Sequence, residues 1–260
     1  MKSIKIIALV CVLTLVNRLG AQELYDSDVL IQGKDTLKYR IMYPKDFSKD
    51  KQYPLVLFLH GAGERGNDNQ RQLTHGSALF ASQENRESFP AIVIFPQCVP
   101  ESYWSNAKVD RTSYPISLEY PLNEPPTKSL QLVLDLMDDI TTKPYVNANQ
   151  VYVGGLSMGG MGTFEILSRR PDMFAAAIAI CGGGNPELAQ NYATKTAMWV
   201  FHGANDNVVA PQLSLEMVNA ILNYGGKPNF TLYAKDNHNS WDSAFAEPEL
   251  LSWLFSNSKK

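Results

Sequence analysis

The chain alternates between short apolar runs and longer segments with helical spacing, from about residue 36 to its end. The short runs are rich in Val, Ile, Leu, Ala and Phe, which is typical of parallel strands buried on both faces. Buried strands are predicted at residues 55–59, 91–95, 151–153, 175–180 and 197–201, an outer strand at 36–42, a last strand at 229–234, and helices at 70–82, 127–141, 158–168, 211–223 and 248–255. This alternation predicts one doubly wound α/β domain, with a mostly parallel central sheet and helices on both faces.

The first 21 residues differ from this pattern. Lys2 and Lys5 precede an apolar run at 6–16, and the small residue Ala21 follows at a suitable cleavage position. These features are typical of a secretory signal peptide, and the run is too short to span a bilayer. We expect a signal peptide at 1–21, a catalytic domain at 22–260, and a secreted or periplasmic protein. A buried N-terminal strand is the alternative.

Charge and composition exclude several partners. The formal net charge is −3, and loss of residues 1–21 would remove three basic and no acidic residues, which leaves −6. No cluster of Lys and Arg suggests nucleic acid or an anionic membrane, and we expect no stable membrane anchor after signal cleavage. Four separated histidines and no clustered cysteines do not build a zinc site. No phosphate loop or dinucleotide fingerprint stands out, so we expect no metal and no cofactor.

One pentapeptide joins a predicted strand to a predicted helix. Gly155-Leu156-Ser157-Met158-Gly159 matches G-x-S-x-G and follows the strand at 151–153. The pentapeptide alone is weak evidence, but a strand before it and a helix after it are what a nucleophile elbow requires. Ser157 is therefore the candidate nucleophile.

A serine hydroxyl needs a base beside it, and the chain has four histidines. His60 and His202 each end an apolar run and precede glycine, so we interpret both as turn residues. His75 lies in a predicted helix on the N-terminal side. His238 follows the last predicted strand, where a loop returns to the edge that carries Ser157. We predict that His238 is the base.

The acid is expected between serine and histidine in the chain, because folds with such a nucleophile elbow place the three residues in the order Ser, Asp/Glu, His. Asp206 lies just after the strand at 197–201. Its carboxylate would fix the imidazole tautomer and stabilise the imidazolium. An ordinary Asx turn at Asp206 is the alternative.

An oxyanion requires two backbone N–H donors. Met158 directly follows the serine at a helix N-terminus and is the first predicted donor. The loop at 60–66 is rich in small residues and supplies the second. We predict Ala62 for that role, with Gly61 close behind, and expect His60 to brace the loop.

These motifs resemble the α/β-hydrolase superfamily across nearly all of residues 22–260. The segments at 60–66, 95–98, 155–160, 238–242 and 248–254, with Trp104, are similar to the secreted single-domain esterases of carbohydrate esterase family 1. They are equally similar to related predicted peptidases and phospholipase/carboxylesterase-like proteins. One position departs from the pattern, since Asn237 replaces the glycine that commonly precedes the histidine; Asn tolerates the same left-handed conformation.

The resemblance implies cleavage of feruloyl or acetyl esters of plant polysaccharides, or of short-chain esters. It also implies a strand order that separates the strands ending near Cys98 and Cys181 by two others, so we expect these cysteines to be unpaired. Residues 99–126 form a long aromatic and proline-rich stretch at the edge where ligands bind in such sheets. Gln97, Tyr103 and Trp104 are candidate substrate contacts, and a small core of the loop itself is the alternative for its aromatic residues.

Two other functions share these residues. A peptidase resembling the prolyl oligopeptidase catalytic domain has the same order of nucleophile, acid and base. Amide hydrolysis asks more of leaving-group protonation, and those enzymes usually carry a gating domain, so an ester is the expected substrate. A non-catalytic sugar-binding relative is the third possibility, which the presence of Ser157, Asp206 and His238 disfavours.

Overall fold

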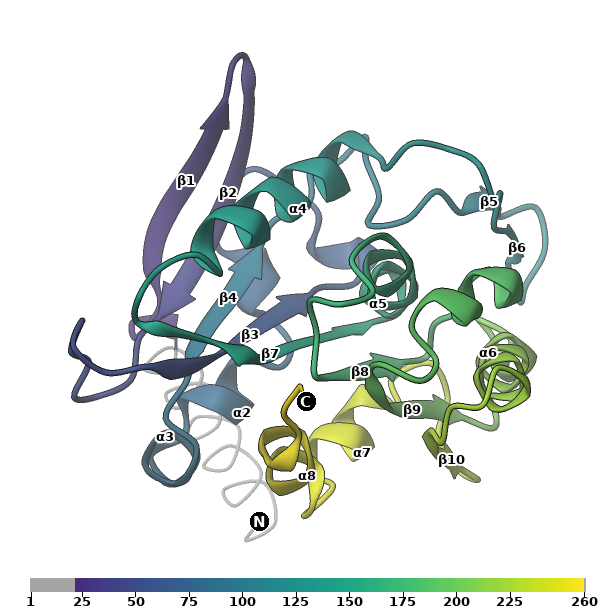
Figure 1. Cartoon of the computed structure of the whole chain (residues 1–260). Helices are drawn as coiled ribbons and strands as arrows, with labels where there is room; N and C mark the ends of the chain where they lie inside the picture. The colour runs from purple at the N-terminus through teal and green to yellow at the C-terminus, as the bar shows by residue number, and fades with distance from the viewer. Residues whose placement is uncertain (1–21, 260) are drawn as a thin grey trace, which may run out of the picture.

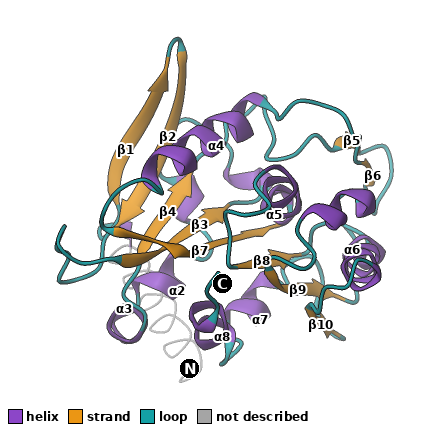
Figure 2. Cartoon of the chain, in the orientation of Figure 1, coloured by secondary structure: helices purple, strands orange, loops and turns teal. Residues whose placement is uncertain are grey.

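The fold is built around one eight-stranded sheet. The computed structural model describes residues 22–259; the signal peptide expected at 1–21 lies outside the described residues. The strand order is β1-β2-β4-β3-β7-β8-β9-β10, parallel from β4 to β10, with β1 and β2 antiparallel at one edge (Figures 1 and 2). The strands are β1 (Asp26–Gln32), β2 (Asp35–Met42), β4 (Ile92–Pro96), β3 (Tyr53–Leu59), β7 (Val146–Leu156), β8 (Ala176–Ile180), β9 (Ala197–Gly203) and β10 (Asn229–Tyr233).

Helices cover both faces of the sheet because successive strand residues point to opposite sides. Leu55, Leu57 and Leu59 of β3 pack in one core, and Val56 and Phe58 pack in the other. The first core is covered by α4 (Lys128–Ile140), α5 (Met158–Arg169) and α6 (Pro211–Asn223), and the second by α2 (Ser77–Ala81), α7 (Trp241–Phe245) and α8 (Leu250–Ser256) (Figure 1). The predicted α/β domain with helices on both faces is confirmed.

The helix predicted at 70–82 is wrong in detail. The segment contains the 3₁₀ turn η2 (Arg71–Leu73) and the short helix α2, and Gly76 between them has φ +81°. A left-handed residue cannot continue a right-handed helix, so the segment divides there. Ser82 ends α2 and caps α3 (Gln83–Ser88) by accepting from the Asn85 N–H.

The long connection after β4 has structure of its own. It contains the two-stranded sheet β5 (Lys108–Asp110) and β6 (Ser117–Glu119), which the sequence did not predict, and it ends at Thr127, whose hydroxyl caps α4. Two other 3₁₀ turns, η1 (Ala62–Glu64) and η3 (Pro186–Asn191), follow β3 and β8. Within residues 22–259, no helix combines the length and the apolar character needed to cross a membrane.

Candidate active site

The turn between β7 and α5 holds Ser157 in a sparsely populated backbone conformation, with φ 53° and ψ −115°. Two glycines allow the chain to pack this tightly. A Cβ at Gly155 would lie 2.3 Å from the carbonyl oxygen of Gly159, and a Cβ at Gly159 would lie 1.9 Å from that of Leu59. The sequence thus builds a strained turn that presents the serine at the carboxyl end of β7.

The structure brings Ser157, His238 and Asp206 into one line of hydrogen bonds. Ser157 Oγ lies 3.0 Å from His238 Nε2, and His238 Nδ1 lies 2.8 Å from Asp206 Oδ2. Because Nδ1 faces a carboxylate, it carries the proton in the neutral ring, which leaves Nε2 free to accept from the serine hydroxyl. The carboxylate is fully buried and the imidazole is 20% exposed. The three residues follow β7, β9 and β10, so they meet at one edge of the sheet.

Asp206 accepts hydrogen bonds at both carboxylate oxygens. Oδ1 receives the backbone N–H groups of Val208 and Val209 at 2.8 and 2.9 Å, and Oδ2 receives His238 and His202. Burial by itself raises the pKa of Asp206, but the hydrogen bonds from His202, His238 and Val208 outweigh it and hold the pKa well below its usual value. The carboxylate is therefore ionised at neutral pH.

Asn237 joins the loops that carry Asp206 and His238. Its Oδ1 accepts from the backbone N–H of His238 at 2.8 Å and of Asn207 at 3.1 Å. It is not among the described non-glycine residues with positive φ, so this position does not use the left-handed conformation that Asn tolerates. The asparagine instead replaces glycine with a side chain that links the two loops.

The buried side chain of His60 supports the loop after β3 through two hydrogen bonds. Its Nε2 accepts from the Cys98 N–H at 3.0 Å, and its Nδ1 therefore donates to the Gly61 carbonyl oxygen at 2.6 Å. Burial lowers the pKa of His60 to about 4, so the ring is neutral at pH 7. Ala62 begins η1 and Met158 begins α5, and the first N–H of a helix has no acceptor within that helix. Ala62 follows β3 and Met158 follows β7, and these strands are neighbours in the sheet. The two candidate oxyanion donors therefore lie at the ends of adjacent strands.

The structure places two expected substrate contacts inside the protein. Trp104 is fully buried and its Nε1 donates to the His60 carbonyl oxygen at 3.1 Å. Gln97 is 2% exposed, and its amide contacts Glu64, Asp68 and Asn69. This burial argues against direct contact with a substrate, because both side chains are already bonded to the loop that they support. Tyr103 is half-buried, and its ring packs under the Arg65 guanidinium at 5.4 Å.

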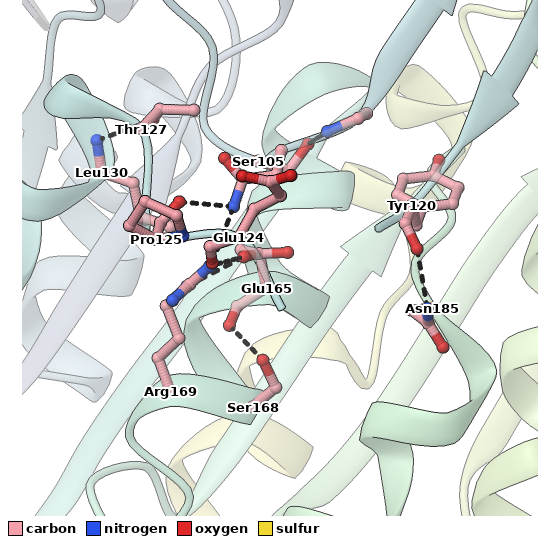
Figure 3. Close-up of polar contacts among 12 residues, drawn as sticks. Ser105, Tyr120, Glu124, Pro125, Thr127, Leu130, Glu165, Ser168, Arg169 and Asn185 are labelled. Carbon is pink, nitrogen blue, oxygen red and sulfur yellow. Dashed lines mark hydrogen bonds and ion pairs between the residues drawn. The ribbon is translucent and has the colours of Figure 1, made fainter. Parts of the chain in front are cut away.

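The stretch 99–126 is tied to the rest of the site at several points. The Ile116 N–H donates to the Val208 carbonyl oxygen at 2.9 Å, next to the acid. Figure 3 shows the Tyr120 carbonyl oxygen accepting from Asn185 at 2.7 Å, and Arg169 reaching the Glu124 carbonyl oxygen at 2.9 Å while it pairs with Glu165. These hydrogen bonds hold the stretch against α5 and against the loops that contain Asn185 and Asp206.

Sequence reasoning missed two contacts of this site. His202, interpreted as a turn residue, reaches Asp206 Oδ2 at 3.2 Å. Trp241 lies between two histidine rings, with centroids 5.4 Å from His238 and 5.2 Å from His75. Neither contact leaves a signal in the sequence, because the first depends on the turn that follows β9 and the second on how α7 folds back.

One group of potential metal ligands occurs in the described part of the chain. Ligand atoms of Cys181, Asp206 and His238 all lie within 4.8 Å of one another. Asp206 Oδ2 and His238 Nδ1 already share a proton, and burial raises the pKa of the Cys181 thiol well above its usual value. A neutral thiol and a protonated Nδ1 fit proton transfer better than cation binding.

The sheet order, the turn at Ser157 and the placement of the three side chains define an α/β hydrolase. The chain belongs to the phospholipase/carboxylesterase family, whose model matches residues 46–248.

Several known proteins are similar to this chain. It is 28% identical over 156 residues to a bifunctional acetylxylan esterase/xylanase of Neocallimastix patriciarum, covering 60% of this chain and 20% of the relative. It is 25% identical over 189 residues to dipeptidyl-peptidase 5 of Porphyromonas gingivalis, covering 73% and 25%. The crystal structure of a thermostable esterase is 34% identical with a TM-score of 0.82, covering 92% of this chain and 64% of that one. The chain thus spans a quarter or less of these two curated relatives.

Proposed function

We propose that the protein is a secreted serine carboxylic-ester hydrolase that works through an acyl-enzyme. The observation that carries the proposal is the unbroken line of hydrogen bonds from Ser157 Oγ through His238 to Asp206. Serine activation requires a base within hydrogen-bond reach and a third group that orients the base. These side chains meet both requirements.

In the first half of the reaction, Ser157 Oγ attacks the ester carbonyl carbon and its proton passes to His238 Nε2. The carbonyl oxygen becomes an oxyanion, which the N–H groups of Met158 and Ala62 stabilise. The bond to the alcohol oxygen then breaks, and that oxygen takes the proton from His238. In the second half, water gives a proton to His238 Nε2 and attacks the acyl carbon. The bond from that carbon to Ser157 Oγ then breaks, His238 returns the proton to Oγ, and the acid leaves.

The proposed substrates are feruloyl or acetyl esters of plant polysaccharides, or short-chain esters. The sequence resemblance and the similarity to a protein named as an acetylxylan esterase support this class. A surface cavity of about 500 Å³ next to the oxyanion loop is lined in part by Arg65, Tyr103 and Lys128. Tyr103 contributes an aromatic side chain to this lining, with Arg65 over its ring, and aromatic side chains pack against aryl groups and sugar rings. We further propose that export removes residues 1–21, which N-terminal sequencing of the exported protein tests.

The decisive experiment compares the wild type with Ser157→Ala on p-nitrophenyl acetate, methyl ferulate and acetylated xylan. We expect kcat to fall by about 10⁴-fold or more, because the nucleophile is lost while binding remains. Ser168→Ala, a serine near the other end of α5, is the matched control and should keep wild-type turnover. Ester hydrolysis that persists in Ser157→Ala would contradict the proposal.

A peptidase remains the second candidate, because the dipeptidyl-peptidase similarity favours it. Rapid cleavage of Pro-p-nitroanilide peptides with negligible ester turnover would support that candidate and reverse the ranking. Cleavage of esters but not of anilides supports the esterase.

A further inference from the structure

A second histidine contacts the acid of the proposed triad. His202 lies near the end of β9, and its side chain is fully buried. Its Nε2 lies 3.2 Å from Asp206 Oδ2 and 3.0 Å from the Val209 carbonyl oxygen. Both neighbours only accept hydrogen bonds, so Nε2 satisfies them only when it carries a proton. His202 is therefore a donor toward the same oxygen that receives His238 Nδ1.

The other ring nitrogen permits two protonation states with the same result. Nδ1 lies 2.7 Å from Ser214 Oγ, which lies 2.8 Å from the Gly182 carbonyl oxygen. If the hydroxyl donates to Gly182, Nδ1 must donate to the hydroxyl and the ring is an imidazolium. If the hydroxyl donates to Nδ1, the ring is neutral. Nε2 carries a proton in both states, so the hydrogen bond to Asp206 is present in both.

We propose that His202 is a positioning residue for the triad: its Nε2–H holds the Asp206 carboxylate with Oδ2 toward His238 and shares the charge of that oxygen. The inference rests on the proposed function, because His202 acts through the acid of that triad. Val208 and Val209 anchor Oδ1, so the carboxylate is held at both ends. Because Oδ2 is shared, it attracts the proton on His238 less strongly than an unshared oxygen would.

Three titratable side chains face the carboxylate from the elements packed around it. They are His202 on β9, His238 after β10 and Cys181 after β8. The thiol is neutral because burial raises its pKa. Among the described residues, a change in the acid limb of the pH–rate profile therefore reports the two imidazoles.

The test uses two substitutions at His202 and one control on full-length protein. His202→Gln keeps an N–H donor near the position of Nε2, and His202→Leu removes it. Val200→Ala is the control, because Val200 is buried on the same strand and two residues away, on the same face. We expect His202→Leu to lower kcat by about 10- to 100-fold with KM nearly unchanged, and to move the acid limb of kcat/KM to higher pH. His202→Gln should keep most of kcat and the wild-type limb, and Val200→Ala should keep both.

A second measurement needs no substrate. The proton resonance of His238 Nδ1–H, identified by its absence in His238→Gln, should shift in His202→Leu and stay in place in Val200→Ala. If circular dichroism shows that His202→Leu does not fold, His202→Asn replaces it, since the shorter amide does not reach Oδ2. A folded variant without the donor that keeps wild-type kcat, acid limb and resonance overturns the inference. Equal losses in the Gln and Leu variants with an unmoved limb also overturn it.

The outcomes separate this inference from the proposed function. An inactive wild type, or an active Ser157→Ala, contradicts the proposed function, and the resonance still reports whether His202 acts on His238. An active wild type with an inactive Ser157→Ala and a normal His202→Leu contradicts only the role of His202.

Discussion

At the scale of single residues, the distance between the turn at Ser157 and the loop at 60–66 depends on Gly159, which has no side chain. Gly159 in the first turn of α5 lies against the carbonyl groups of Leu59 and His60, which lead into the loop that carries Ala62. Any Cβ there must push α5 away from the end of β3. Met158 and Ala62 would move apart, and with them the two proposed oxyanion donors.

We therefore predict that Gly159→Ala destabilises the protein by about 3 kcal/mol or more and lowers kcat. The physical reason is a 1.9 Å approach of the new Cβ to a backbone oxygen, which cannot rotate away. Gly63→Ala is the matched control, since a Cβ there meets nothing within 4 Å and its free energy of unfolding should change by less than about 0.5 kcal/mol. Urea unfolding and ester turnover of both variants check this. Equal stability of the two variants would contradict it.

The candidate catalytic residues could be predicted from the sequence because their positions follow from the order of the strands. Ser157, Asp206 and His238 each come directly after a predicted strand, and parallel strands bring their carboxyl ends to one edge. The supporting residues were not predictable in the same way. Whether Trp104 points toward solvent or under the loop depends on the path of an irregular segment, and no periodicity encodes that path.

At the scale of elements, the stretch 99–126 is fastened to α5 by a hydrogen bond from Arg169, which also forms a partly buried ion pair within the helix. Arg169 donates through Nε to Glu165 Oε1 at 2.8 Å and through a terminal nitrogen to the Glu124 carbonyl oxygen at 2.9 Å. The Glu165 side chain is only 9% exposed, whereas the neighbouring pair between Arg170 and Asp138 is 36% and 45% exposed. The first pair lies within α5 and holds Arg169 toward the Glu124 carbonyl oxygen. The second joins the end of α5 to α4 and is screened by solvent.

We predict that Arg169→Met lowers the free energy of unfolding by roughly 1–3 kcal/mol and speeds amide hydrogen exchange around residues 120–126, because it leaves the Glu165 carboxylate buried and unpaired. Arg170→Met should cost less than about 1 kcal/mol and leave that exchange unchanged. Denaturant unfolding and hydrogen-exchange mass spectrometry measure both effects. The same exchange rate in the two variants would show that Arg169 does not fasten the stretch.

Element prediction succeeded for the sheet and failed in the irregular segments. Apolar runs located the parallel strands, because burial on both faces leaves a strong compositional signal. The helix predicted at 70–82 failed because helical spacing does not report the left-handed conformation of Gly76. The strands β5 and β6 are three residues long with one partly buried apolar position each, so their hydrophobic pattern is too short to predict a strand.

At the scale of the whole molecule, the strand order decides the state of the two cysteines in the domain. Cys98 follows β4 and Cys181 follows β8, and β3 and β7 lie between these strands. Both cysteines are free and buried in the described structure, which confirms the expectation that they do not pair. A disulfide requires Cα atoms within about 7 Å, and adjacent strands in a sheet are already about 4.8 Å apart. From β4 to β8 there are three such spacings, which is farther than a disulfide can bridge.

We predict that the folded domain, residues 22–260, does not react with Ellman's reagent and releases two thiols per chain on denaturation. Burial also raises the pKa of Cys98 to about 11, so the reactive thiolate is scarce even during local opening. A reducing agent should leave the unfolding midpoint unchanged, because there is no crosslink to remove. Cys98→Ala is the control and should release one thiol on denaturation. A midpoint that falls on reduction would contradict the strand order, since only a rearranged sheet could bring the two cysteines together.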